Sequence, residues 1–490
     1  MEPDNVPLKV KHPAGSYPCR WHLVDEETGA ALHPQGELSL LPERSPSGSA
    51  YGKVPTKSGD HSWPQEFKFT SLAGELLNGA GVVLIDAWMH VISPPGFPGF
   101  SYAEGNANVG AALALVGPDA HMVQHRKIQS IRVQITGMDR ILGLAPIVSR
   151  TIPNNPFSDP ETTWKVVTRR DGGQEWENDE LFLRVVHHSS ATVFADYQFG
   201  IRFTPLIEID IKVPIDAVVA FNDIVHSLVR VVSILTGESA SITFLEMKPA
   251  SSKEGEEMPY LQAFARPISQ QPYQPEPGKT PTLERSLLRC ADDDVSLLDL
   301  VSGWRKLLAE KNPLIYTYDP FALGADQHPR ARFLLLVQAL EGLSNRENRL
   351  ADQQATYEGR KSRAVNACMN FLTGANRKFV KNKFPRSGVS LDDRLRDMFE
   401  SLPADPVPHF DKLDIIKQVI GEIADVKTSV SAIRKIRNDL AHGSRSYNDY
   451  ELLRLARLLQ IVVRVHALRV LGVSDVVQAR ALNGLLPYVV

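Results

Sequence analysis

Hydrophobic and polar positions alternate with a period of two in several stretches of the first 210 residues, a pattern typical of β-strands. Residues 66–70 show this alternation, and residues 127–135 and 181–186 contain similar short β-type runs. Proline and glycine punctuate these runs, for example in residues 93–99. We therefore predict a two-layer β domain over residues 17–210.

Apolar positions then change to helical spacing. They form a wide stripe that predicts one helix over residues 215–237, with Gly237 as a residue that can close it. Residues 242–245 predict a strand after this helix. A helix packed on a sheet would complete an N-terminal domain, which we place at residues 1–248.

Residues 249–281 are rich in Ser, Glu, Gln and Pro, which predicts a surface excursion or an interdomain connection. We assign residues 249–294 to this connecting segment and residues 295–490 to a helical bundle. The expected fold class is α+β, with a β-rich N-terminal domain, a helix packed on it and an all-α C-terminal domain. The predicted helices of the bundle cover residues 297–308, 350–374, 391–402, 411–441 and 448–471, and one more helix has Asp326 as its N-cap before Pro329.

Residues 437–442, Arg-Asn-Asp-Leu-Ala-His, place a cation, an amide and an imidazole at the end of a predicted helix. Gly443 follows at once, where a helix takes a left-handed C-cap. The planar guanidinium of Arg437 suits phosphate oxygens, Asn438 can orient the imidazole or the phosphate, and His442 can move a proton near neutral pH. These groups suit cleavage of a phosphodiester without metal. The alternative is a helix end whose His and Arg only stabilise the helix dipole.

The spacing Arg-Asn-x-x-x-His resembles the signature of the HEPN superfamily of helical ribonucleases and ribonuclease-derived domains. Residues 332–342 look like the first long helix of the HEPN domain in ApeA-type anti-phage defence proteins. The order of parts also fits: a long β-rich region, this helix, a variable middle, the motif helix and a last long helix. The C-terminal bundle is therefore expected to be HEPN-like.

This resemblance implies an endoribonuclease of an abortive-infection defence system that uses no metal and no cofactor. It assigns catalysis to Arg437, Asn438 and His442, with the ribose 2′-hydroxyl as nucleophile and a 2′,3′-cyclic phosphate and a 5′-hydroxyl as products. It implies transfer RNA or another structured RNA as substrate. It also implies a homodimer or higher oligomer formed through the HEPN domain, and an N-terminal sensor that responds to a phage-derived trigger.

Charge is unevenly distributed along the chain. The net charge of the whole chain is −3. Residues 331–490 hold 25 Lys and Arg against 17 Asp and Glu, so residues 1–330 have more acidic than basic residues. The C-terminal part is therefore the one suited to a polyanion, although a solvated basic face explains the same numbers.

Individual residues support this assignment to different degrees. The segment 377–386 combines cations with two phenylalanines and is a candidate RNA-binding element or, alternatively, a solvated helix face over core phenylalanines. Glu341 can hold the guanidinium of Arg437 or of Arg434, or can lie exposed. The candidate RNA-binding residues are Arg377, Lys378, Lys381, Lys383 and Arg445.

Several other classes of protein are not supported. The cysteines Cys19, Cys290 and Cys368 are far apart and include no Cys-x-x-Cys pair, so neither a disulfide framework nor a zinc site is predicted. The N-terminus lacks the apolar core of a signal peptide, and arginines interrupt the apolar helix at 452–471. We expect a cytoplasmic protein without membrane contact.

Two other functions stay open. In the first, the bundle keeps the HEPN fold but serves as a non-catalytic RNA-binding or dimerisation module. In the second, the β domain is a carbohydrate-binding module or hydrolase, which would need clustered aromatic residues with paired carboxylates.

Overall fold

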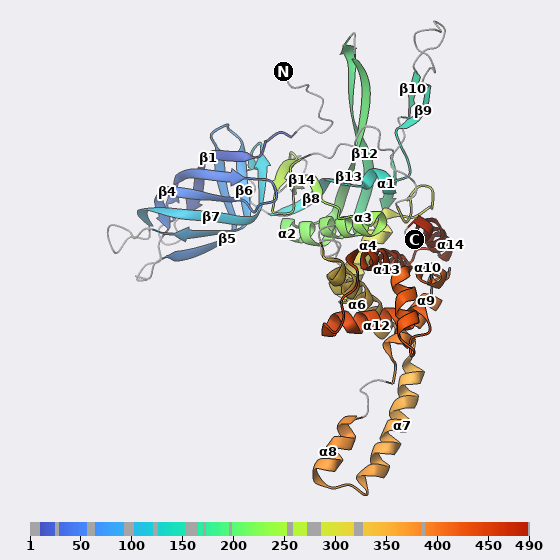
Figure 1. Cartoon of the computed structure of the whole chain (residues 1–490). Coiled ribbons are helices and arrows are strands. Elements are labelled where there is room, and N and C mark those ends of the chain that lie inside the picture. The colour runs from blue at the N-terminus through green and yellow to red at the C-terminus, as the bar shows by residue number, and fades with distance from the viewer. Residues whose placement is uncertain are drawn as a thin grey trace. The chain divides into compact units, whose positions relative to one another are not determined.

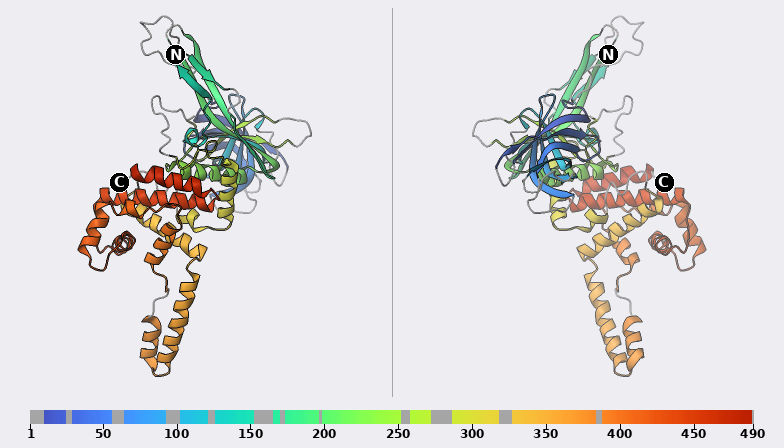
Figure 2. Two further views of the ribbon diagram at one scale, coloured as in Figure 1. Left: turned by 90° about the vertical axis from the view of Figure 1, so that its right-hand side faces the viewer. Right: turned by 90° about the vertical axis from the view of Figure 1, so that its left-hand side faces the viewer.

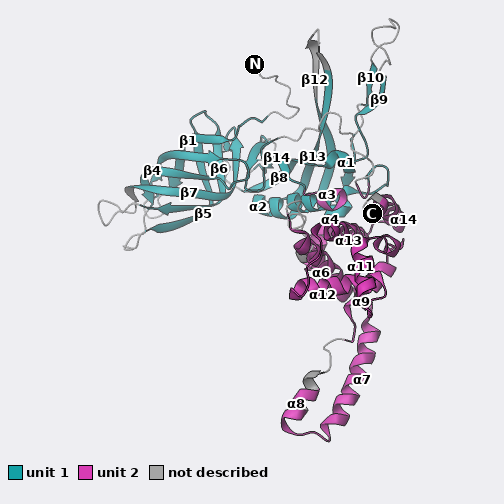
Figure 3. Ribbon diagram, in the orientation of Figure 1, with its two compact units in different colours: residues 1–232, 240–282, 289–301 teal, residues 233–239, 283–288, 302–490 magenta. Residues whose placement is uncertain are grey.

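The computed structural model describes residues 10–24, 29–55, 64–92, 102–120, 126–151, 165–169, 173–195, 198–251, 258–271, 286–317, 327–383 and 388–488. The chain forms two compact units (Figure 3). Unit 1 comprises residues 1–232, 240–282 and 289–301, and unit 2 comprises residues 233–239, 283–288 and 302–490.

Unit 1 is built mainly of strands (Figure 1). The strands predicted at residues 66–70, 127–135, 181–186 and 242–245 are all present, whereas the turn predicted at 93–99 lies outside the described residues. The strands are β1 (Gly15–Val24), β2 (Ala31–Leu32), β3 (Gln35–Leu40), β4 (Ser47–Pro55), β5 (Gln65–Leu76), β6 (Gly81–Val91), β7 (Tyr102–Gly117), β8 (Lys127–Ile135), β9 (Ile147–Thr151), β10 (Lys165–Thr168), β11 (Glu175–Glu177), β12 (Leu181–Ala195), β13 (Gln198–Asp216), β14 (Ile242–Pro249) and β15 (Leu261–Phe264).

Part of the main sheet closes into a barrel. Strands β7, β4, β3, β1, β5 and β6 pair in that order, and β6 pairs back with β7. Closure leaves these strands without a free edge, and alternate side chains fill the interior. Trp21, Leu38 and Val109 are examples, each no more than 1% exposed. The two-layer prediction did not include this closure.

The rest of the main sheet runs β11-β12-β13-β8-β14-β15 and joins the barrel at β7. The helix predicted at 215–237 is confirmed as α2 (Ala217–Val219), a π-helical turn η2 (Ala220–Val225) and α3 (His226–Thr236), and Gly237 follows with a positive φ. This helix has the length and composition of a membrane span, but 67% of its most apolar window is buried inside the structure, as in a core helix.

The segment predicted to be a surface excursion contains a core strand. β15 pairs with β14 and β7, and its four residues are all buried. The prediction that residues 249–281 only connect two domains is therefore wrong at residues 261–264. The strand was not predicted because its apolar run is short and the residues on both sides of it are rich in Ser and Pro.

Unit 2 is helical, so the predicted α+β class is confirmed. Its long helix α13 packs against α6 and α14, and α6 also contacts α5, α9 and α12. The helices are α1 (Met138–Ile141) in unit 1, α4 (Leu297–Ala309), which runs from unit 1 into unit 2, and then α5 (Pro313–Thr317), α6 (Pro329–Glu347), α7 (Ala351–Met369), α8 (Gly374–Lys383), α9 (Leu391–Glu400), α10 (Val407–Phe410), α11 (Asp414–Glu422), α12 (Ser429–His442), α13 (Asp449–Val470), α14 (Asp475–Leu485) and the 3₁₀ turn η4 (Leu486–Tyr488).

Three predicted helix boundaries need correction. The single helix expected at 411–441 is two helices, because Thr428 and Ser431 form a capping box that begins α12. The helix expected at 350–374 ends at Met369, and α8 begins at Gly374. The N-cap of α6 is His328, whose ring nitrogen accepts a hydrogen bond from the Arg330 amide at 3.2 Å. The predicted cap, Asp326, lies outside the described residues.

Candidate active site

Helix α12 carries the Arg-Asn-x-x-x-His motif to an exposed helix end. The capping box at Thr428 fixes its first turn, and buried Val430, Ile433 and Ile436 hold its apolar face in the bundle. Gly443 ends the helix in the left-handed conformation, with φ 67°, as predicted. His442, the last helical residue, is exposed. Packing therefore holds the helix in the bundle and leaves its last two residues, Ala441 and His442, open to solvent.

Asn438 contacts one of the other two motif side chains and shares a helix face with the second. Asn438 and His442 are four residues apart and therefore share one face of the helix. Arg437 is five residues before His442, which places its Cα well around the helix from that face. Its guanidinium bends back, and Nη1 donates to Oδ1 of Asn438 at 3.2 Å. The cation is thereby drawn toward the face that carries the imidazole.

Glu341 lies next to this cation. Its carboxylate is 3.6 Å from Nη2 of Arg437, and both side chains are about one-third exposed, at 32% and 35%. Of the two partners that the sequence allowed, the structure therefore selects Arg437. Arg434 instead pairs with Asp392 at 2.8 Å. At 3.6 Å and partly in water, the Glu341 pair orients the guanidinium without neutralising it as a buried pair would.

Asp439 anchors the end of the helix. Its buried carboxylate accepts hydrogen bonds from Lys435, from the Ser444 hydroxyl at 3.0 Å and from the Tyr447 hydroxyl at 2.7 Å. Burial alone would raise the pKa of Asp439, but these donors outweigh it and hold the pKa below its ordinary value. Burial, together with the hydrogen bond to Asp439, raises the pKa of Tyr447. Asp439 thus holds the residues that follow α12 against the last turn of the helix.

Two arginines have partners around the same helix end. Arg445, predicted as an auxiliary cation for RNA, lies 2.6 Å from Glu422, and its guanidinium lies 4.9 Å from the centre of the Tyr447 ring. An RNA phosphate would have to compete with Glu422 for it. Arg330 of α6 donates to the carbonyl of Leu440 in the last turn of α12. Neither Arg330 nor Tyr447 belongs to a motif, so the sequence offered no sign of their roles.

The predicted RNA-binding segment falls on α8 and the residues after it. Lys378 is exposed. Arg377, Lys381 and Lys383 lie on α8, but their side chains are outside the described part of the structure. One of the two phenylalanines of the segment, Phe379, is 60% exposed, so it is not the core residue that the alternative required.

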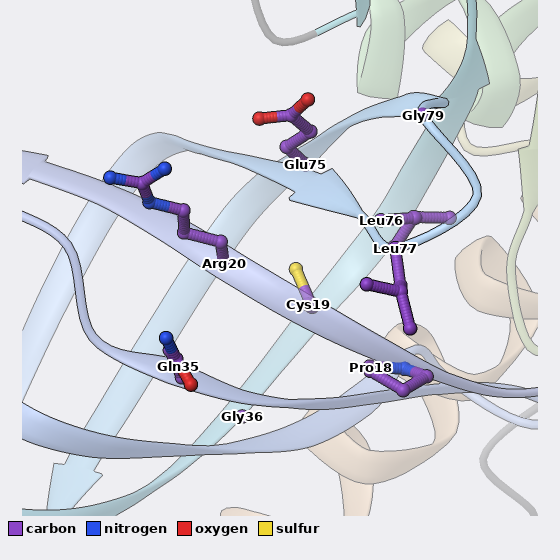
Figure 4. A pocket seen from close by; sticks show the side chains of 9 residues that line it. All are labelled: Pro18, Cys19, Arg20, Gln35, Gly36, Glu75, Leu76, Leu77 and Gly79. Atoms are coloured by element: carbon purple, nitrogen blue, oxygen red, sulfur yellow. The ribbon is translucent and has the colours of Figure 1, made fainter.

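Pockets in the described part of unit 1 bear on the hydrolase interpretation. One, of about 350 Å³, opens in the barrel wall, with Arg20 and Glu75 side by side on β1 and β5 (Figure 4). Another, of about 690 Å³, is lined by residues 142–150 and by His187, whose pKa is lowered by burial. Among the described residues, each of these pocket linings includes a single carboxylate, Glu75 or Asp139, whereas most glycoside hydrolases use a pair. The pockets therefore give the hydrolase interpretation no support.

Within the described ranges, no three His, Cys, Asp or Glu side chains are grouped to hold a metal ion.

Two family models match the chain. One, described as ApeA N-terminal domain 1, matches residues 29–304, and the other, described as Apea-like HEPN, matches residues 334–476. No curated protein and no solved structure gives a match. The first model alone covers more than half of the 490 residues, and the second includes the whole motif at 437–442. The chain therefore belongs to the ApeA family of anti-phage defence proteins and carries a C-terminal HEPN domain of nuclease type.

Proposed function

We propose that this protein is a metal-independent endoribonuclease that cleaves RNA by 2′-hydroxyl attack when an infection triggers it. The observation that carries the proposal is the end of α12. An exposed imidazole, an amide one turn before it and a guanidinium at 3.2 Å from that amide share this helix end. A proton-transfer group beside a cation suits a scissile phosphate, where charge grows during reaction.

In the proposed reaction, the 2′-oxygen bonds to the adjacent phosphorus while the bond from phosphorus to the 5′-oxygen breaks. A base removes the proton of the 2′-hydroxyl, and an acid gives a proton to the leaving 5′-oxygen. His442 serves as one of these two groups. Arg437 stabilises the pentavalent phosphate with charged hydrogen bonds, and Asn438 holds the guanidinium in place. The products are a 2′,3′-cyclic phosphate and a 5′-hydroxyl.

A single His442 supplies only one of the two proton-transfer groups. We therefore propose a homodimer or higher oligomer that brings a second His442 to the same phosphate. We do not propose α13 as the dimer face, because most of its apolar positions are buried, among them Leu455, Leu459 and Val462 at 0% exposed. Tyr450, which is 66% exposed in the first turn of α13, is better placed for this contact.

The proposed partners are an RNA, of which transfer RNA is one candidate, and a phage-derived trigger that acts on the N-terminal domain. We place the protein in the cytoplasm. Arg377, Lys378, Lys381, Lys383 and Arg445 are proposed to contact phosphates, with Arg445 released from Glu422 when RNA binds.

The test is cleavage of a short unstructured RNA by His442→Ala and by Arg437→Ala. Each variant should lose about 10²-fold or more in maximal rate, because general acid–base catalysis and charge stabilisation each supply about that much. Circular dichroism and melting should match the wild type, since both side chains lie at a solvent-facing helix end. Unchanged cleavage by either folded variant would contradict the assignment.

A chelator distinguishes metal-free from metal-dependent cleavage. We expect the wild-type rate on this unstructured RNA to persist in chelator, because the proposed reaction uses protein side chains only. Loss of cleavage, restored by an added divalent ion, would contradict the metal-independent mechanism.

A non-catalytic RNA-binding module is the second candidate, and one observation favours it. Arg437 already has a carboxylate partner in Glu341, so it can act as a structural cation. In that case the wild type binds RNA without cleaving it, and His442→Ala changes nothing measurable.

A further inference from the structure

Helices α7 and α8, with the turn at residues 370–373, form a projection that we call the arm. Figure 2 shows the two helices running together away from the rest of unit 2. Each packs mainly against the other. No residue of α7 is buried along its 19 residues, which span about 28 Å. A helix pair without a buried face gains little from hydrophobic burial, so its sequence serves something other than the core.

Near its base the arm is held by contacts with the chain just before α9, although no residue of α7 is buried. The backbone amide of Gly388, just before α9, donates to the side-chain oxygen of Gln354 at 3.0 Å. A Cβ at Gly388 would lie 2.1 Å from the Cβ of Tyr357, so only glycine permits this crossing. The chain is therefore held against α7 near the base, and the far end of the arm is the part left for a partner.

The arm carries most of the excess positive charge of the C-terminal region. Residues 351–383 hold seven Lys and Arg against two Asp and Glu, a net charge of +5. The whole of residues 331–490, which include the arm, has a net charge of +8 from 25 Lys and Arg and 17 Asp and Glu. A polyanion that binds this region is therefore attracted first to the arm.

Two arginines of α7 differ from the arginines of the bundle in their partners. In the bundle, Arg346 lies 2.9 Å from Glu310 and Arg349 lies 3.4 Å from Asp397. On α7, Arg360 and Arg363 are exposed, and neither contacts a carboxylate among the described residues. Such guanidinium groups can bind phosphate without breaking an existing ion pair.

The turn between the two helices exposes an aromatic ring. Phe371 directly follows α7 and its first capping residue, and it is 87% exposed. Phenylalanine rings beside cations are the elements that stack on unpaired bases while phosphates are held nearby. A ring at the turn, with cations along the helices behind it, fits an RNA in which an unpaired loop adjoins a duplex.

We propose that the arm binds folded RNA, with Arg360, Lys361 and Arg363 on the phosphates of a stem and Phe371 stacked on an unpaired loop base. This inference rests on the proposed RNA-cleaving function and names its substrate class, a stem–loop RNA. It adds α7 and the turn to the α8 cations already assigned to RNA. The competing occupant, a second copy of this chain, offers no unpaired base on which Phe371 could stack.

The test measures binding of three labelled RNAs by fluorescence anisotropy: a stem–loop, its fully paired duplex and a short unstructured strand. All proteins carry His442→Ala so that RNA stays intact. The first arm variant is Arg360→Gln/Lys361→Gln/Arg363→Gln, and the second is Phe371→Ser. The matched control, Lys412→Gln/Lys417→Gln/Lys427→Gln, removes three exposed cations from the bundle.

The triple arm variant should lose about two units of the salt dependence of log affinity for the stem–loop and the duplex, since each phosphate contact contributes about 0.7–0.9 units. The control should lose none. Phe371→Ser should weaken binding of the stem–loop by about 5- to 100-fold and leave the duplex unchanged.

Unchanged affinity and salt dependence in both arm variants would overturn the proposal. An arm variant that turns a dimer into a monomer at unchanged RNA affinity would assign the arm to a second copy instead. Binding is read without cleavage, in proteins that carry His442→Ala. If binding depends on the arm but the protein with His442 intact does not cut the same stem–loop, the proposed reaction is contradicted and this inference stands.

Discussion

The bundle and the arm of unit 2 both contain arginines, but these arginines differ in whether they pair with carboxylates. In the bundle, arginines hold elements together: Arg434 pairs with Asp392, Arg469 with Glu347 and Arg454 with Glu451. On the arm, Arg360 and Arg363 have no such partner among the described residues. Net charge per region therefore says little about binding until it is known which cations already have a carboxylate.

Burial separates the two regions in the same way. Helix α13 buries most of its length, including His466 and Arg464, whereas α7 buries nothing. Substitutions on the arm should therefore change RNA affinity and spare stability, and substitutions in the bundle should do the reverse. The motif at the end of α12 lies between these extremes, with a buried start and an exposed end.

The largest expected effect is on affinity, from α8. Replacing Arg377, Lys378, Lys381 and Lys383 with Gln should weaken RNA binding and lower its salt dependence by about three units, because each phosphate contact contributes somewhat less than one. The maximal rate at saturating RNA should change little, since these residues offer no proton-transfer group. Salt titrations of affinity, with single-turnover rates alongside, test both statements. A collapse of the saturated rate at unchanged affinity would place these cations in the active site.

The second effect is on stability and comes from the bundle interior. Burial, reinforced by Arg469 and Arg349, lowers the pKa of His466 to about 3. The folded state therefore resists protonation that the unfolded chain accepts near pH 6.5, so stability is present above pH 6.5 and is lost as pH falls toward 3. At pH 5 this group should cost about 2 kcal/mol relative to pH 7.

Urea unfolding at pH 7 and pH 5 measures this loss, and His466→Leu should reduce it. The arm variants provide the comparison, because arginine and lysine do not titrate in this range and should leave the acid loss unchanged. The same pH dependence in the wild type and in His466→Leu would show that other groups cause it.

The smallest effect concerns Glu341, a residue of α6 whose carboxylate lies beside Arg437 of the motif. Glu341→Gln keeps the size of the side chain and removes its charge, so the free energy of unfolding should change by less than about 1 kcal/mol, as for other exposed pairs. The turnover number should fall by about tenfold while KM holds, because a guanidinium that is no longer oriented stabilises the reacting phosphate less well. A rise in KM alone would make Glu341 part of RNA binding.

Long regular elements were readable from the sequence. The strand at 127–135 and the last long helix follow strong two-residue or helical periods, and each was placed within a residue or two. The break between α11 and α12 was missed because Ile423 and Val426 continue the apolar pattern across it. Only the capping box at Thr428 and Ser431 marks the new helix. Barrel closure was missed because it requires β4 to pair with β7 and β1 to pair with β5, and no local pattern reports pairings between strands so far apart in the sequence.

The candidate site was partly readable. The helix end at Gly443 follows from periodicity. The sequence offered Arg437 and Arg434 as partners of Glu341, and only the structure selects Arg437. The anchoring of Asp439 by Tyr447 depends on a loop conformation after the helix, and Arg330 reaches Leu440 from another helix. Such contacts depend on tertiary structure and cannot be predicted from residue types alone. The exposure of α7 was not predicted, although residues 351–369 contain no Leu, Ile or Phe.

The most direct test of this account is the cleavage rate at saturating stem–loop RNA, with affinity measured in parallel, for His442→Ala and Arg360→Gln/Lys361→Gln/Arg363→Gln. The account predicts that His442→Ala loses about 10²-fold or more in rate and keeps its affinity. The arm variant should keep its rate and lose affinity. A full rate in His442→Ala, or a lost rate with full affinity in the arm variant, would contradict the assignment of chemistry to the end of α12 and of binding to the arm.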